Sequence, residues 1–268
     1  MYEEKLKKGI YILPSIFTCA NMVCGVLSII ESINGNFTTA AWLIILAIAF
    51  DILDGRIARL TKTTSEFGIQ LDSLSDLVSF GVAPSIMMYQ LVFNSSGKIG
   101  IAISVLFVLC SGLRLAKFNV VAIRGIVCNS FVGLPVPAAA GLLMSFVLSY
   151  ELFYVAPYKS LTFKTIPILM KNMPIFFEIM PIIMIILSLL EVSNIQYISF
   201  KKIKLSKPKS FRFFVLIILL ILLIIIFPQN IIFILFSLYV FSGIFNIFMK
   251  YYAISKNKFN LKDKKNEN

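Results

Sequence analysis

The sequence predicts an all-α, polytopic membrane protein with about eight transmembrane helices. Hydrophobic residues make up 59% of its 268 residues, charged residues make up only 14%, and the mean hydropathy is +0.90. Soluble domains usually carry about a quarter charged residues, so this composition excludes an ordinary water-soluble domain. The apolar residues gather in long stretches, and the basic residues lie mainly on one side of them. These two patterns complete the evidence for the fold class.

Eight apolar stretches are long enough to cross about 30 Å of hydrocarbon at about 1.5 Å per residue. We expect transmembrane helices at residues 10–32, 37–60, 69–93, 99–121, 131–155, 173–193, 211–228 and 230–252. The third stretch is diluted by Asp72 and Asp76, and the last two flank Pro228, so they also fit one broken hairpin. The first stretch is too long for a signal peptide and lacks a cleavage site of small residues, which predicts a retained helix.

Basic residues predict the orientation in the membrane. When loops are assigned alternately to two sides, all but four of the 25 Lys and Arg residues lie on the side of the N-terminus. The four exceptions are Lys98, Lys159, Lys164 and Lys171. Because basic loops favour the cytoplasm, we expect both termini there and a location in the cytoplasmic membrane. Contact with anionic lipid explains the basic runs at 201–212 and 250–265, so we expect no nucleic-acid partner.

Four aspartates, Asp51, Asp54, Asp72 and Asp76, lie within otherwise membrane-like sequence. Ionised residues at that depth are costly and indicate function. Helical spacing places the first two on one arc of a helix, and the last two, four residues apart, on one face of the next helix. Such carboxylates need cations, and oxygen-only ligands favour Mg²⁺ or Mn²⁺. The absence of histidine excludes His-based catalysis and His-ligated zinc.

The residues around these aspartates favour phosphoryl chemistry. Two divalent ions shared by four carboxylates can act on both sides of a phosphorus undergoing in-line displacement. Gly55 and Ala58 leave the same helical arc bare, and Gly68 does so at the start of the next helix, so a ligand can approach closely. Arg59 is placed to hold a phosphate oxygen. Ion transport is the alternative outside enzymes, but it gives no reason for the glycines and Arg59.

The spacing of these residues resembles the motif of the CDP-alcohol phosphatidyltransferase family, D-x2-D-G-x2-A-R-x8-G-x3-D-x3-D, which runs here from Asp51 to Asp76 without an insertion. The resemblance implies a six-helix core, two Mg²⁺ or Mn²⁺ ions, a CDP-lipid donor and CMP as the leaving product. It implies that all four aspartates are metal ligands and that Asp76 is also the general base. It covers residues 1–200, which leaves 201–268 as a basic loop, two further transmembrane helices and a basic cytoplasmic tail.

The same resemblance implies a binding site for the CDP-lipid. Its implied residues are Gly55, Ala58, Arg59, Ser65 and Gly68, together with Asn21 and Thr18 of the first predicted helix. The hydroxyl of Ser65 is equally explained as a loop residue. Asn21 is equally explained by a hydrogen bond between helices.

The residues alone do not identify the acceptor alcohol. Arg114 and Lys117 are three positions apart on one helix face and suit a carboxylate or a phosphate. They are also explained as cytoplasmic anchors. Serine, glycerol phosphate and inositol phosphate all carry an anionic group, so all three stay open at this point.

Three further segments, 79–84, 114–119 and 131–140, resemble the serine-using branch of the family. This resemblance implies transfer of the phosphatidyl group of CDP-diacylglycerol to the hydroxyl of L-serine. It implies Arg114, Lys117 and Asn119 as the serine-binding residues. A sister enzyme that uses glycerol phosphate, inositol phosphate or another alcohol is the first alternative, and a non-enzymatic cation transporter is the second. A homodimer is left open.

Overall fold

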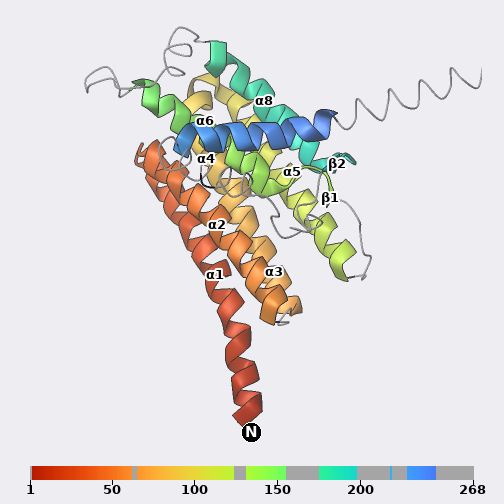
Figure 1. Cartoon of the computed structure of the whole chain (residues 1–268). Coiled ribbons are helices and arrows are strands. Elements are labelled where there is room, and N and C mark those ends of the chain that lie inside the picture. Colours follow the sequence, from red (N-terminus) through yellow and green to blue (C-terminus); the bar gives the residue numbers. More distant parts are fainter. Residues whose placement is uncertain are drawn as a thin grey trace, which may run out of the picture.

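A computed structural model of the chain describes residues 2–61, 65–123, 131–154, 175–197, 218 and 228–245. Its long helices are α1 (Tyr2–Ile33), α2 (Phe37–Thr61), α3 (Glu66–Asp76), α5 (Gly97–Ile123), α6 (Val136–Tyr154), α8 (Ile175–Val192) and a helix at Pro228–Phe245 (Figure 1). Between α3 and α5 lie η1 (Leu77–Val82), α4 (Ala83–Met88), η2 (Tyr89–Phe93) and η3 (Asn94–Ser96). The strands β1 (Phe131–Val132) and β2 (Gln196–Tyr197) pair antiparallel.

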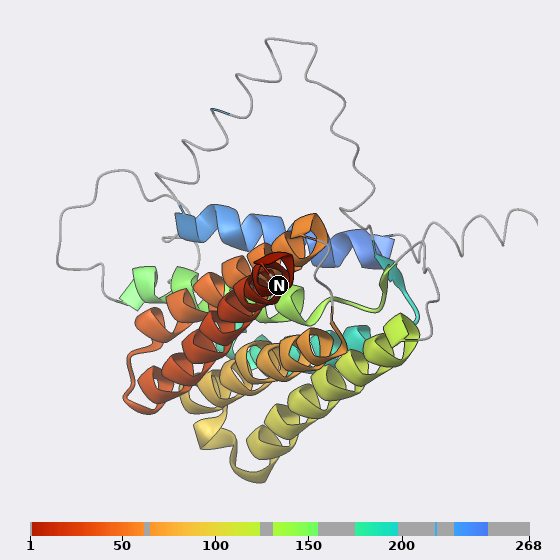
Figure 2. The same cartoon turned by 90° about the horizontal axis from the view of Figure 1, so that it is seen from below.

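Five helices of the described chain are long and apolar enough to cross a membrane. They are Ser15–Ile33, Phe37–Thr61, Glu66–Phe93, Gly97–Val121 and Pro228–Phe245. The first four coincide with the first four predicted spans, so the prediction of an all-helical polytopic membrane protein is confirmed. The number of eight crossings is not confirmed. The predicted seventh span lies almost wholly outside the described residues, and the helix at 228–245 runs across the other long helices rather than alongside them (Figures 1 and 2).

The predicted fifth span starts too early. We expected a helix from residue 131, but β1 occupies Phe131–Val132 and α6 begins only at Val136. Gly133 has a φ of +82°, a left-handed conformation that glycine adopts without strain. Pro135 lacks a backbone N–H and disfavours a helical conformation in the residue before it. The peptide instead docks on the end of α8, where the Leu134 N–H donates to the Leu190 carbonyl at 3.0 Å.

Helix α1 packs along α2 and also contacts α3 and η1 (Figure 2). Small residues on α2 permit this approach, because Ala40, Ala41 and Ala47 are fully buried. On α1, the Ser28 hydroxyl donates to the Ala40 carbonyl of α2 at 2.9 Å. This close pairing fixes how α1 is rotated about its own axis, and it therefore fixes which α1 side chains face α3.

The contact between α1 and η1 depends on Gly25. A Cβ atom at this position would lie 2.8 Å from the Cα atom of Ser79, which is too close for backbone to tolerate. We expect Gly25→Ala to separate α1 from η1 and to destabilise the protein by about 1–3 kcal/mol, as overpacking of a close contact generally does. The thermal midpoint of the detergent-solubilised protein would measure the loss.

Gly112→Ala is the matched control for this substitution. Gly112 also lies in a helix, but its new Cβ atom would meet only the Leu77 side chain at an ordinary 3.7 Å. Because alanine is the better helix former, we expect this variant to be as stable as the wild type or slightly more stable. An equal loss in both variants would contradict the packing argument for Gly25.

The helix that begins at α3 changes its hydrogen-bond register directly after Asp76. In η1 the turns are wider, and the Ala83 N–H donates to the Val78 carbonyl five residues earlier. Wider turns of this kind occur frequently at functional sites. Here η1 precedes Pro84, which has no N–H to donate, and it buries Ser79, Phe80 and Gly81 against the neighbouring helices.

Candidate functional site

Three of the four predicted aspartates converge between α2 and α3. Carboxylate oxygens of Asp51 on α2 and of Asp72 and Asp76 on α3 all lie within 4.8 Å of one another. Asp76 is buried, whereas Asp51 and Asp72 are half-buried. Asp54, one turn along α2 from Asp51, is also buried and lies within electrostatic range of the other three. These four residues are called the carboxylate cluster below.

Helix α1 supplies hydrogen-bond donors to the carboxylate cluster. The Thr18 hydroxyl donates to Asp54 Oδ2 at 2.8 Å, and Asn21 Nδ2 donates to Asp76 Oδ1 at 3.1 Å. Thr18 and Asn21 are both buried, and they are three residues apart on one face of α1. Asn21 therefore makes the hydrogen bond between helices that one reading of the sequence proposed, and its partner is an aspartate of the motif.

Serines on the following segment hold the same face of α1 in place. The Ser75 hydroxyl donates to the Thr18 carbonyl at 3.0 Å, and the Ser79 hydroxyl donates to the Asn21 carbonyl at 2.9 Å. Each serine thus bonds to the backbone of a residue whose side chain contacts the cluster. These bonds fix the positions of Thr18 and Asn21 relative to α3, and a preorganised site needs such support.

The oxygen-only donor set of the cluster fits a divalent cation of the Mg²⁺ or Mn²⁺ type. Within the part of the chain that the structure describes, Asp72 Oδ1 is buried without a hydrogen-bond partner. Buried polar atoms are nearly always paired, so a carboxylate oxygen that has no such partner and lies beside two other carboxylates fits the role of a cation ligand. Asp51, Asp72 and Asp76 are the residues placed to hold it, and the identity of the ion stays a prediction.

Residues at the end of α2, beyond the cluster aspartates, are exposed. Arg59 is exposed and lies within electrostatic range of Asp51 and Asp54. Its guanidinium reaches back to Gly55, where a Cβ atom would lie 3.6 Å from Arg59 Nη1 and would meet no other described neighbour. Packing within the described chain therefore does not require glycine at position 55. The bare surface beside Arg59 is free for a ligand, with half-buried Ala58 on the same helix.

Ser65 and Gly68 form the start of α3. The Gly68 N–H donates to the Ser65 hydroxyl at 3.0 Å, which makes Ser65 the N-cap of the helix. This contact accounts for Ser65 as a structural residue. Ser65 is exposed, which is also compatible with the predicted contact to phosphate.

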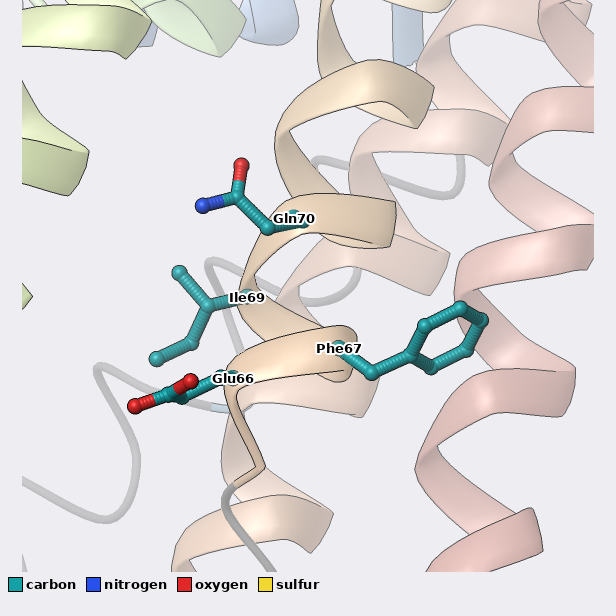
Figure 3. A pocket seen from close by; sticks show the side chains of 4 residues that line it. All are labelled: Glu66, Phe67, Ile69 and Gln70. Atoms are coloured by element: carbon teal, nitrogen blue, oxygen red, sulfur yellow. The ribbon is translucent and has the colours of Figure 1, made fainter.

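A cavity of about 250 Å³ lies against the first turns of α3. It is lined by Glu66, Phe67, Ile69 and Gln70, and Figure 3 shows that Phe67 projects away from the other three. The cavity is separate from the carboxylate cluster, because no aspartate of the cluster lines it.

The three predicted serine-binding residues on α5 differ in their surroundings. Lys117 is exposed and donates to Asn194 Oδ1 at 3.0 Å, and Asn119 accepts a hydrogen bond from Ser73 at 3.0 Å. Both therefore already have partners in the protein. Arg114 is half-buried, lies within electrostatic range of Asp76 and Glu191, and has a buried Nε atom with no partner among the described residues. Of the three, Arg114 is the best placed to bind a ligand.

Sequence reasoning missed Glu191 and Ser111. Glu191 lies near the end of α8 with only 1% of its surface exposed, and its Oε2 atom accepts a hydrogen bond from the Ser111 hydroxyl at 2.8 Å. A signal was present, because an ionisable residue inside an apolar segment indicates function by default. The sequence does not show that α8 packs beside α5, and that contact brings Glu191 to Ser111 and Arg114.

Comparison with known proteins identifies a family whose motif contains the aspartates of this site. The family model for CDP-alcohol phosphatidyltransferase matches residues 11–170. The chain is 39% identical over 195 residues to the CDP-diacylglycerol–serine O-phosphatidyltransferase of Helicobacter pylori, which covers 73% of this chain and 75% of that protein. It is 41% identical over 151 residues to the archaetidylserine synthase of Methanothermobacter thermautotrophicus, which covers 56% and 63% of the two chains.

Proposed function

The chain belongs to the CDP-alcohol phosphatidyltransferase family, and on this premise we propose that it transfers the phosphatidyl group of CDP-diacylglycerol to the hydroxyl of L-serine. The products are phosphatidylserine and CMP. The observation that carries the proposal is the convergence of Asp51, Asp72 and Asp76 within 4.8 Å, beside an exposed arginine and a bare glycine surface. The names of relatives at 34–41% identity all contain serine, which supports serine as the acceptor.

The chain's own residues account for the proton transfer and for orientation of the substrates. Asp76 accepts the proton of the serine hydroxyl, and the serine oxygen forms a new bond to the β-phosphorus of the donor. The bond from that phosphorus to the oxygen bridging it to CMP breaks, and its electron pair leaves with CMP. Asn21 holds the Asp76 carboxylate in place through its hydrogen bond at 3.1 Å. No covalent intermediate with the protein is required.

In this proposal the donor lies against the end of α2 and the start of α3, next to the cluster. Gly55, Ala58 and Gly68 leave room for the cytidine diphosphate, Arg59 binds a phosphate oxygen, and Ser65 lies beside it. The four aspartates of the cluster would hold two Mg²⁺ or Mn²⁺ ions. When bound, these ions would neutralise the charge of the pyrophosphate and of the leaving CMP. The hydrogen bonds from Thr18 and Asn21 hold the carboxylates of Asp54 and Asp76 in place.

We assign the protein to the cytoplasmic membrane with both termini in the cytoplasm, because the basic loops lie on that side. Residues 1–200 form the transferase unit, and 201–268 add a basic loop, two further helices and a basic tail. This arrangement places the exposed residue Arg59 at the cytoplasmic surface, where CDP-diacylglycerol can enter from the inner leaflet and serine from solution.

An acceptor comparison tests the proposed function. Purified protein in detergent receives CDP-diacylglycerol, Mg²⁺ or Mn²⁺, and serine, glycerol 3-phosphate or inositol phosphate in separate reactions. We expect CMP release and labelled lipid with serine alone. Lipid formed with a different alcohol would keep the family and replace the acceptor. The absence of metal-dependent CMP release with every acceptor would overturn the transferase proposal and would favour the cation transporter.

A further inference from the structure

Arg114 and Glu191 occupy the same seam between α5 and α8. Ser111, Arg114 and Lys117 are spaced three residues apart and lie on one face of α5. Ser111 bonds to Glu191 at 2.8 Å, and Lys117 bonds to Asn194, three residues after Glu191, at 3.0 Å. Arg114 therefore lies between two pairs that already bridge the seam.

Two atoms of ionisable side chains in this seam have no hydrogen-bond partner within the described part of the chain. Among the described residues, Glu191 Oε1 and Arg114 Nε are both buried without a hydrogen-bond partner. An ion pair that served only to join the helices would be expected to use these atoms for each other, because unpaired buried charge is destabilising. One acceptor on a carboxylate and one donor on a guanidinium thus stay available, and both are shielded from water.

The position of Glu191 is rigidly fixed. Its side chain is held by Ser111, and the Gly133 and Leu134 N–H groups donate to the carbonyls of Ile195 and Leu190 on either side of it, at 2.8 and 3.0 Å. A side chain at Gly133 would collide with the Glu191 carbonyl, so glycine is needed for this close approach. The segment at 131–140 thereby holds the end of α8 against α5.

The seam is also close to the proposed base. Arg114 lies within electrostatic range of Asp76 as well as of Glu191. A Cβ atom at Gly81, in the wide turn that follows Asp76, would lie 3.3 Å from the Ser111 Cβ. A small molecule held between Arg114 and Glu191 would therefore lie beside the carboxylate cluster.

We infer that Glu191 and Arg114 form the recognition site for a zwitterionic hydroxy amino acid. Glu191 Oε1 accepts a hydrogen bond from the ammonium group, Arg114 donates to the carboxylate, and the hydroxyl points to Asp76. A phosphate-bearing alcohol would face repulsion from the Glu191 carboxylate, so the same residue that binds serine rejects glycerol phosphate and inositol phosphate. This inference rests on the proposed function and names the residue that determines its acceptor specificity.

Acceptors that lack one charge test each half of the site. The test compares kcat/KM for serine with that for 3-hydroxypropionate, which lacks the ammonium group, in the wild type and in Glu191→Gln. Because a hydrogen bond to a charged group is lost, we expect serine use to fall about 10- to 100-fold and 3-hydroxypropionate use to change little. The ratio of the two values should therefore fall by the same factor, while the KM for CDP-diacylglycerol stays unchanged.

Glu178→Gln is the matched control, because Glu178 is an exposed glutamate on the same helix. It should leave the acceptor ratio at its wild-type value. Ethanolamine lacks the carboxylate of serine. In Arg114→Ala, the ratio of kcat/KM for serine to kcat/KM for ethanolamine should therefore fall. The KM for serine should rise more than the KM for CDP-diacylglycerol.

The outcomes separate this inference from the proposed function. If the wild type shows no serine-dependent CMP release, the proposed function fails. If the wild type is active and Glu191→Gln slows both acceptors equally, Glu191 only joins α8 to α5 and the inference is wrong. Should Glu191→Gln fail to fold, Glu191→Asp keeps the charge but shortens the side chain, which withdraws the carboxylate from the ammonium group. An unchanged acceptor ratio in that variant would overturn the inference, and a reduced ratio would support it.

Discussion

Replacing Asp76 with Asn is expected to lower serine-dependent CMP release by roughly 1,000-fold or more. Asp76 is 7% exposed, accepts a hydrogen bond from Asn21, and has a carboxylate oxygen within 4.8 Å of those of Asp51 and Asp72. Asparagine has nearly the same shape, but its amide cannot accept the proton of the serine hydroxyl and is a poorer ligand for a cation. Steady-state turnover at saturating serine and CDP-diacylglycerol measures the effect.

The fifth aspartate of the chain supplies a matched control for this variant. Asp263 lies outside the motif, so Asp263→Asn should keep wild-type turnover. Both variants should elute like the wild type from a sizing column in detergent, because the substitution preserves the volume of the side chain. Full activity in a correctly folded Asp76→Asn variant would show that another group takes the proton.

The aspartate cluster illustrates how far sequence reasoning reaches. The spacing of Asp51, Asp54, Asp72 and Asp76 predicted that two helices present carboxylates to each other, and the structure brings three of these side chains together. The pairing of Asn21 with Asp76 joins residues 55 positions apart. It depends on how α1 is rotated about its own axis, which the contacts of α1 with α2 and of Gly25 with Ser79 fix and which periodicity does not encode.

The proposed acceptor site was only half predicted for the same reason. Arg114 was identified from its position on a cationic helix face, whereas Glu191 was not, although both lie at one seam. Which helix packs beside α5 depends on tertiary contacts between segments 80 residues apart, such as that of Ser111 with Glu191. Hydropathy predicts that a segment is apolar and helical, but it does not identify the neighbour of that segment.

Hydropathy also does not determine the direction of a helix. The stretch at 230–252 was predicted as a crossing, and a long apolar helix is present at Pro228–Phe245. Its direction across the bundle follows from its contacts. A Cβ atom at Gly243 would collide with the buried ring of Tyr197, and one at Gly141 of α6 would collide with Phe236. Glycines on both sides of this interface permit the close crossing.

Divalent cations are expected to stabilise the folded protein through the carboxylate cluster. Three carboxylates within 4.8 Å repel one another, and Asp72 Oδ1 is buried without a partner in the described chain. A cation that binds the folded state should raise the thermal midpoint in detergent by roughly 5–10 °C at about 100 times its Kd. Mg²⁺ and Mn²⁺ should both do so, and chelation with EDTA should reverse the shift and abolish CMP release.

Whether the variant Asp72→Asn melts above or below the wild type should depend on the presence of a divalent cation. With EDTA it should melt at or above the wild-type midpoint, because one of the repelling charges has been removed. With Mg²⁺ or Mn²⁺ it should melt below the wild type, because a ligand has been lost. If the cluster served only to join α2 to α3, the difference in thermal midpoint between Asp72→Asn and the wild type would be the same with and without cation. An unchanged difference would therefore exclude a metal site at these residues, whereas the reversal is specific to cation binding by Asp72.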